Sequence, residues 1–190
     1  MRQFDEMYSR LPATGNAGEV RKHYEAYARW LQAQDPKTMA ARREEAEMIF
    51  RRVGITFAVY GDKDEDGSGT ERLIPFDLIP RVIAAQEWKS MEAGLVQRVT
   101  ALNRFIHDVY HDQEILKAGV IPREQIENNA QFRPEMVGVD VPNNIYSHIS
   151  GIDIVRAPDS AGKGEYYVLE DNLRVPSGVS YMLEDRKMMM

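Results

Sequence analysis

The sequence predicts an α/β (α+β) fold in which helices flank a mixed or antiparallel sheet. Residues 151–156 (GIDIVR) and 165–172 (EYYVLEDN) have the composition of two strands, and the loop between them is rich in turn-forming residues. Residues 84–112 carry the longest helical pattern, with apolar residues at the spacing of one helix face. The chain has 190 residues, of which 43% are hydrophobic, so it has the length of a single domain with a substantial core.

The composition argues against several classes of protein. The 24 basic and 30 acidic residues give a net charge of −6, which disfavours a general surface for nucleic acid or anionic membrane. The absence of cysteine excludes disulfides and thiolate zinc sites. No apolar run approaches the ~20 residues of a spanning helix, and MRQFDEMYSR has no apolar core of a signal peptide. We therefore expect a cytoplasmic protein with no nucleic acid and no membrane among its partners.

The first part of the chain predicts an arm and two helices. Residues 1–18 are expected to form an N-terminal arm, because LPATGNAG consists mostly of residues that favour loops. Residues 19–34 have apolar side chains spaced for one helix face. A second helix is expected at 38–53, with Thr38 as a candidate N-cap and Gly54 as its stop.

Two strands are expected next, at 55–60 and 71–78, because both segments are rich in β-branched and aromatic residues. The turn between them has the acidic spacing of an EF-hand loop, at Asp62, Asp64, Asp66 and Gly67. However, Leu73 stands where that loop has a bidentate glutamate, and strands rather than helices flank the turn. The sequence thus favours a solvated acidic turn without calcium.

The helix at 84–112 is predicted to bury a stripe made of Leu95, Val99, Leu102, Ile106 and Val109. His107 and His111 have the i, i+4 spacing of a zinc site, but no third ligand or HExxH context accompanies them. They are interpreted as histidines of the helix surface. Shorter helical turns are expected at 113–118 and 122–128.

Residues 133–150 are expected to be mostly extended, with a turn at 142–144 and a strand at 145–150 that leads into the hairpin. His148 lies on this expected strand. Two interpretations stay open for it: a structural histidine whose hydrogen bonds are satisfied, and a substrate-binding residue.

The register of the hairpin at 151–178 follows from its apolar residues. Pairing Arg156 with Glu165 sets Asp153 opposite Val168. One face then carries only apolar side chains, at Ile152, Ile154, Tyr167 and Leu169. A slip by one residue would send this set to the wrong face, so this register is favoured.

The other face of the predicted hairpin carries Asp153, Glu170 and Asn172. Carboxylate and carbonyl oxygens are the ligands that a hard cation such as Mg²⁺ prefers. The alternative is two solvated acids and an asparagine at a strand end. The apolar reverse face and the Pro-Ser-Gly turn at 176–178 favour the metal site.

These residues resemble those of a known family. In ATP-grasp ligases a strand with an aspartate is followed by a strand that ends in Glu-x-Asn and by a Pro-Gly turn; here GID, VLEDN and VPSG match. The wider sequence is similar to circularly permuted ATP-grasp proteins of type 2, related to glutathionylspermidine synthase. The similar segments are 54–62, 71–81, 97–113, 133–142 and 167–186. Ser177, which separates the proline from the glycine, departs from the pattern of many members.

The resemblance implies that residues 19–190 are the amino-terminal portion of a permuted ATP-grasp domain. It implies an ATP-dependent carboxylate–amine, peptide-bond-forming ligase that works through an acyl phosphate, with ATP as cosubstrate. Asp153, Glu170 and Asn172 would hold Mg²⁺ or Mn²⁺, and the other substrates would be a small carboxylate, an amine or a peptide. In the permuted type the adenine pocket and the phosphate-binding lysines follow the metal strands. We therefore expect an incomplete ligase that is inactive alone.

Two arginines are candidate substrate-binding residues, since arginine suits bidentate recognition of carboxylates and phosphates. Arg174 lies just past Asn172, and a contact there with phosphate or carboxylate would make it catalytic as well as substrate-binding. Arg81 lies in a segment that resembles the family. The alternative for Arg81 is a surface ion pair, and for Arg174 an exposed or structural role.

The alternative function is a non-catalytic binding or partner-docking module derived from an ATP-grasp. The resemblance implies operon neighbours such as an alpha-E protein or a transglutaminase-like protein, which would be its partners. The same metal ligands would persist in such a module if it had lost its activity recently.

Overall fold

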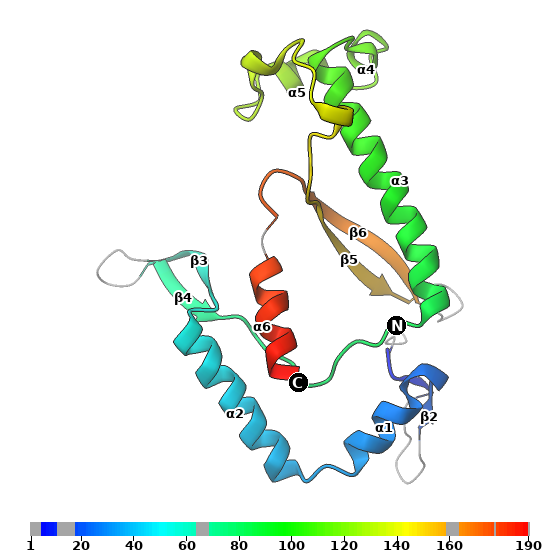
Figure 1. Ribbon diagram of the computed structural model, residues 1–190, viewed down its shortest axis with the longest axis vertical. Coiled ribbons are helices and arrows are strands. Elements are labelled where there is room, and N and C mark those ends of the chain that lie inside the picture. Colours follow the sequence, from blue (N-terminus) through cyan, green and yellow to red (C-terminus); the bar gives the residue numbers. More distant parts are fainter. Residues whose placement is uncertain (1–4, 11–17, 64–68, 159–163, 177, 190) are drawn as a thin grey trace. The chain divides into compact units, whose positions relative to one another are not determined.

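The computed structural model describes residues 5–10, 18–63, 69–158, 164–176 and 178–189 (Figure 1). The chain divides into two compact units: unit 1 consists of residues 1–84 with 177–190, and unit 2 of residues 85–176. Helices combine with strands, and each strand pair described is antiparallel. The predicted α/β (α+β) class is confirmed, with the strands arranged as two-stranded sheets.

Unit 1 begins with a short strand pair rather than directly with a helix. Strand β1 (Tyr8–Arg10) pairs with β2 (Glu19–Val20), and a 3-10 turn at Lys22–Tyr24 leads into helix α1 (Glu25–Gln32). The helix predicted at 19–34 therefore starts later than expected, because the backbone of its first residues is used in pairing with β1. The boundary between an arm and the rest of the chain at residue 19 stays a prediction.

Helix α2 (Pro36–Val53) begins two residues earlier than predicted. Asp35 is its N-cap, and its carboxylate accepts a hydrogen bond from the Lys37 amide at 3.3 Å. The prediction of Thr38 as N-cap was wrong, because proline fits the first helical position and moves the cap to the residue before it. Gly54 ends the helix at φ 78°, as predicted.

Strands β3 (Thr56–Lys63) and β4 (Gly69–Leu73) form the second antiparallel pair of unit 1. The strand predicted at 71–78 ends at Leu73, because Pro75 has no N–H to donate to a strand ladder. The central part of the predicted acidic turn, residues 64–68, lies outside the described residues, so its lack of calcium stays a prediction. Helix α6 (Val179–Met189) also belongs to this unit. The buried apolar side chains of the unit are Tyr24, Ala28, Ala46, Phe50, Ile55 and Leu78.

Unit 2 is built around helix α3 (Ala85–Tyr110), which confirms the long helix predicted from periodicity. The predicted stripe is half-buried along its length and fully buried at Val109. Helices α4 (Glu114–Lys117) and α5 (Arg123–Glu127) follow, also as predicted. In the described part of the chain, no helix is long and apolar enough to span a bilayer.

The strand predicted at 145–150 was wrong: this segment is irregular and follows 3-10 turns at Pro134–Met136 and Pro142–Asn144. The side chain of Asn103, from the middle of α3, explains the difference. Its Oδ1 accepts hydrogen bonds from the amides of Tyr146 and Ser147, at 2.8 and 3.0 Å. These amides are therefore bonded to a helix side chain and not to a neighbouring strand.

Replacing Asn103 by alanine should lower the free energy of unfolding by about 1–3 kcal/mol, because two partly buried backbone amides lose their acceptor. Urea unfolding followed by circular dichroism measures this loss. Asn128→Ala is the matched control, since Asn128 is exposed and should change stability by less than about 0.5 kcal/mol. Equal stabilities for the two variants would contradict the role given to Asn103.

Candidate functional site

The hairpin that carries the predicted ligands is formed by β5 (Gly151–Ala157) and β6 (Glu165–Asn172), which confirms both predicted strands. The predicted register was wrong. Arg156 pairs with Tyr166 rather than Glu165, and Asp153 lies opposite Glu170 rather than Val168. Next to the turn the strands pair one residue away from the prediction, since Ala157 lies opposite Glu165. A bulge between Asp153 and Ile154 accommodates one extra residue of β6 and adds a second residue to the difference.

The bulge also overturns the apolar face predicted for the hairpin. Tyr167 is 48% exposed and Leu169 is 65% exposed, so neither lies in a core. Tyr167 pairs with Val155, not with a residue on the face of Ile152 and Ile154. One extra residue in β6 reverses the face of the β6 side chains that lie between the bulge and the turn. The pattern of apolar residues does not reveal this bulge.

One face of the hairpin packs against α3, and Figure 1 shows β5 and β6 running alongside this helix. Arg156 lies 2.8 Å from Glu87 in an ion pair (Nη1 to Oε1). Arg98 donates two hydrogen bonds to the carboxylate of Asp171, at 2.7 and 2.6 Å. These pairs fix which side of β6 faces the helix, and sequence reasoning missed them because their partners lie far apart in the chain.

The predicted metal ligands lie on the opposite side, here called the ligand face and defined by Asp153, Glu170 and Asn172. Asp171 points to α3, so its neighbours Glu170 and Asn172 point away from it. The register pairs Asp153 directly with Glu170. Opposite residues of an antiparallel pair have Cβ atoms about 4.5–5.5 Å apart. The amide Nδ2 of Asn172 donates to Oε1 of Glu170 at 2.9 Å, which joins the second and third candidates.

The turn after β6 lies against the ligand face. Gly151 pairs with Asn172, and a Cβ atom at Gly151 would lie 3.2 Å from Cβ of Pro176. A side chain at residue 151 would therefore push the proline away. The missing side chain lets the chain beyond Asn172 approach the start of β5 closely.

The donor set of the ligand face fits a hard divalent cation. Asp153 and Glu170 are exposed carboxylates directly across the strand pair, and like charges in this position repel. Among the described residues no lysine or arginine pairs with either of them. No group of three His, Cys, Asp or Glu converges in that part of the chain, so the third oxygen would come from the Asn172 amide. Two carboxylates and an amide are ligands that Mg²⁺ and Mn²⁺ accept.

The ion pair behind the ligand face has a pH signature. Hydrogen bonds from Arg98 lower the pKa of the Asp171 carboxyl below its ordinary 3.8. An acid with a depressed folded-state pKa stabilises the protein above the unfolded-state pKa, and this contribution disappears as the pH falls through the folded-state value. Asp171→Asn should therefore lower Tm by about 2–4 °C at pH 7, and by progressively less below pH ~4.

Thermal unfolding between about pH 2.5 and 7 measures this difference. Glu92→Gln, at an exposed carboxylate of α3, is the control and should leave Tm nearly unchanged. A Tm difference between the protein and Asp171→Asn that stays constant down to the lowest pH would contradict the ion pair's role. Added salt should narrow the difference, because Arg98 is 43% exposed.

Ser147 fixes the backbone just beyond the ligand face. It is 6% exposed, and its hydroxyl donates to the Leu173 carbonyl at 3.1 Å. The same residue is bound to α3 through the Asn103 side chain. The segment between Asn172 and Arg174 is therefore tied to the long helix, by residues whose role the sequence did not indicate.

Arg174 is exposed, and its Nη1 donates to Oε1 of Gln131. It borders a cavity of about 390 Å³ in unit 2. His148 is also in unit 2 and is exposed, but it lies in the irregular segment and not on the predicted strand. Arg174 thus follows the ligand face directly. Among the described residues, no hydrogen bond to the His148 side chain favours either interpretation of that residue.

Arg81 belongs to unit 1, not to the unit that carries the other candidates. Its Nε lies 3.3 Å from Oε1 of Glu6. The cavity that it borders is also lined by Asp5 and Asp77. Arg81 therefore forms an ion pair with Glu6 beside a cavity that two further acidic residues line. Binding of an anionic substrate at Arg81 stays a prediction.

The histidine pair of α3 is part-buried, so the prediction of surface histidines was wrong. The rings of His107 and His111 stack with centroids 4.1 Å apart. Nδ1 of His107 lies 3.1 Å from the Tyr146 hydroxyl, and Nε2 of His111 lies 3.3 Å from the Asp140 carboxylate. Residues of the following segment cover the two rings, which the i, i+4 spacing did not reveal.

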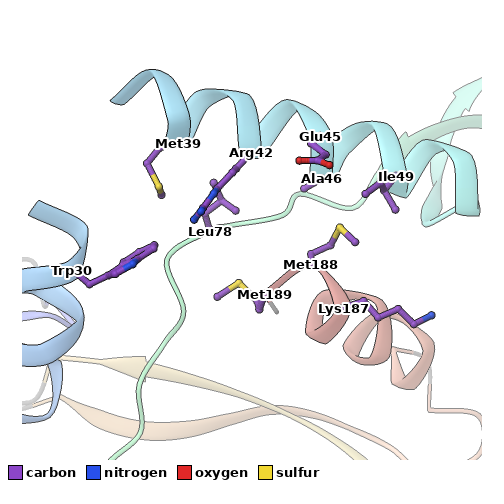
Figure 2. A pocket seen from close by; sticks show the side chains of 10 residues that line it. All are labelled: Trp30, Met39, Arg42, Glu45, Ala46, Ile49, Leu78, Lys187, Met188 and Met189. Carbon is purple, nitrogen blue, oxygen red and sulfur yellow. The ribbon is translucent and has the colours of Figure 1, made fainter. Parts of the chain in front are cut away.

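Unit 1 contains a cavity of about 420 Å³ under α2 (Figure 2). Trp30 and Met39 approach it from α1 and α2, and Met188 and Met189 approach it from α6. Its charged lining is mixed, with Arg42, Glu45 and Lys187. No residue of the predicted site lines it, so the candidate site stays in unit 2.

Comparisons with known proteins identify the family of the chain. A family described as a circularly permuted ATPgrasp matches residues 80–190. An uncharacterized protein of Synechocystis sp. is 44% identical over 160 residues, which cover 84% of this chain and 32% of the relative. An uncharacterized protein of Mycobacterium leprae is 44% identical over 184 residues, 97% of this chain and 30% of the relative. No solved structure matches.

A further relative carries the name of an enzyme. A putative glutamate–cysteine ligase of Frankia casuarinae is 39% identical over 173 residues, which cover 90% of this chain and 19% of that protein. The chain spans about a third of the length of the first two relatives above. Since the family match extends over more than half of the chain, including both strands of the ligand face, the chain belongs to the circularly permuted ATP-grasp family.

Proposed function

We propose that this chain supplies the metal-binding strands of an ATP-dependent carboxylate–amine ligase. One observation carries the proposal: the Asp171–Arg98 ion pair fixes β6 against α3 and turns Glu170 and Asn172 to the side where Asp153 lies. The family membership supports ATP as a substrate and ligase chemistry in general.

The reaction that fits this site has two transfer steps. A carboxylate oxygen of the acid attacks the γ-phosphorus of ATP; a P–O bond forms, the bond to ADP breaks, and ADP leaves with the electron pair. The amine then attacks the carbon of the acyl phosphate, the bond to the phosphate oxygen breaks, and the amine loses a proton to give the amide. Positioning and charge stabilisation can provide most of the catalysis of phosphoryl transfer.

Asp153, Glu170 and Asn172 are the residues that would hold Mg²⁺ or Mn²⁺. A bound ion of this kind offsets negative charge on the phosphate oxygens. Arg174, directly after the ligand face, would bind an anionic oxygen of phosphate or of the acid through its planar guanidinium. Ser147 and Asn103 position the backbone between these groups by the hydrogen bonds described above.

The named relative supports a class of reaction but does not identify the substrates of this protein. It is named a putative glutamate–cysteine ligase, which supports joining of a carboxylate to an amine. This chain covers 19% of that protein, so its named acid and amine are not transferred. The proposed substrates are ATP, a small carboxylate and an amine or peptide, and the proposed partners are operon neighbours of the alpha-E or transglutaminase type.

The test is ADP release by the protein encoded by the complete reading frame, assayed with Mg·ATP and a panel of amino acids, short peptides and polyamines. We expect ADP release that depends on both an acid and an amine, and little turnover by residues 1–190 alone. A folded protein that binds Mg·ATP but forms neither ADP nor acyl phosphate with any member of the panel would favour the non-catalytic docking module instead.

A further inference from the structure

The cavity beside Arg174 has the size and lining of a site for a small organic molecule. Its volume is about 390 Å³, within the range of ligand pockets. Helix α3 contributes Phe105, Ile106 and Val109 to its wall. Phe132 also lines the cavity and stacks against Tyr110, with ring centroids 5.2 Å apart and planes inclined by 9°. These side chains offer apolar and aromatic contacts.

The charge of the cavity is positive. Among the described residues that line it, Arg174 is the one with a formal charge, and no aspartate or glutamate is present. Its guanidinium is bonded to the neutral side chain of Gln131, and none of the described carboxylates forms an ion pair with it. A guanidinium has further N–H donors in the fork that matches a carboxylate. The rim of the cavity is therefore complementary to an anion.

The cavity is joined to the ligand face by one short backbone segment. Asn172 belongs to the ligand face, Leu173 lines the cavity, and Arg174 stands at its rim. The Leu173 carbonyl is held by the buried hydroxyl of Ser147, which itself lines the cavity. An acid whose apolar part filled the cavity would present its carboxylate near the candidate metal ligands.

We propose that the cavity binds the acid substrate, and that this acid is a carboxylate with an apolar or aromatic body. The body lies against the α3 side chains and Phe132, and the carboxylate is bound by Arg174 in exchange for Gln131. This assignment rests on the proposed ligase function, which it deepens by naming the class of the acid. An apolar protein segment is the competing occupant, and it would need no negative charge.

The experiment uses the 190-residue chain with ¹³C-labelled methyl groups, observed by NMR, because Ile106, Ile126 and Leu173 line the cavity. The probes are hydrocinnamate, propionate, which lacks the ring, and phenylpropylamine, which carries the opposite charge. Hydrocinnamate should shift these methyl signals saturably, and the other two probes should bind at least about 10-fold more weakly. Arg174→Gln should weaken hydrocinnamate binding about 10-fold. Arg133→Gln, at an exposed arginine outside the lining, is the control and should not weaken it.

Equal binding of the acid and the amine would overturn the inference and favour an apolar segment as the occupant. So would hydrocinnamate binding that is unchanged in Arg174→Gln, or shifts confined to methyl groups outside the cavity. The NMR experiment contains no ATP, so its result does not depend on whether the protein has ligase activity. Arg174-dependent binding without ADP release by the complete protein would refute the ligase function and leave the carboxylate site standing. ADP release by the complete protein without Arg174-dependent binding of hydrocinnamate would refute the carboxylate site and leave the ligase function standing.

Discussion

Replacement of Glu170 by glutamine should lower kcat of the proposed ligase, assayed as the protein encoded by the complete reading frame, by about 100- to 1000-fold. This is the cost of removing one group that stabilises charge in a transition state. Glutamine keeps the size of the side chain and an oxygen that can accept the hydrogen bond from Asn172. The fold should therefore survive while the ligand face loses one of its two charges. Steady-state ADP release at saturating ATP measures the change, with Tm as the check on folding.

Glu165→Gln is the matched control for this experiment. Glu165 lies on the same strand and pairs with Ala157, which places it on the same side of the hairpin as Glu170. It is exposed and accepts a hydrogen bond from the Tyr167 hydroxyl at 2.9 Å. Its replacement should leave kcat within about 2-fold. Similar losses in both variants would show that general negative charge, and not a metal ligand, supports activity.

Replacement of Arg174 by lysine should lower kcat/KM by about 10- to 100-fold. Lysine keeps the positive charge but loses the planar fork that binds two oxygens at once. The same change at Arg133, which is exposed in the same unit, should have little effect. Measuring kcat/KM for the acid at fixed ATP, and for ATP at fixed acid, tells which substrate Arg174 contacts. Full activity of Arg174→Lys would show that the reaction needs only a positive charge at this position, or no contact with residue 174 at all.

The helices of this protein were predictable because their signals are local. The period of apolar residues located α3, and Gly54 marked the end of α2. The start of α2 was misplaced because two capping residues compete there, and proline favours the earlier one. The irregular segment at 145–150 was not predictable, since its amides are bonded to Asn103, more than 40 positions away in the sequence.

The hairpin shows why the ligand face could be anticipated although its register was wrong. Near the turn the true pairing differs from the predicted one by one residue, which reverses the face of Tyr167. Beyond the bulge it differs by two residues, and a shift of two restores the original face. Asp153 therefore lies on the side of Glu170 in both registers. The ion pair of Asp171 with Arg98, which holds the strand in this orientation, is a tertiary contact with no local signal.

Mn²⁺ binding followed by electron paramagnetic resonance tests whether the ligand face binds a divalent cation. The 190-residue chain is titrated with Mn²⁺, and the free-ion signal is compared among the unmodified chain, Glu170→Gln and Glu165→Gln. We predict saturable binding by the unmodified chain and by Glu165→Gln, and at least about 10-fold weaker binding by Glu170→Gln, because one of two charged ligands is lost. Identical titrations for all three proteins would show that Glu170 is not a metal ligand and would contradict cation binding at the ligand face.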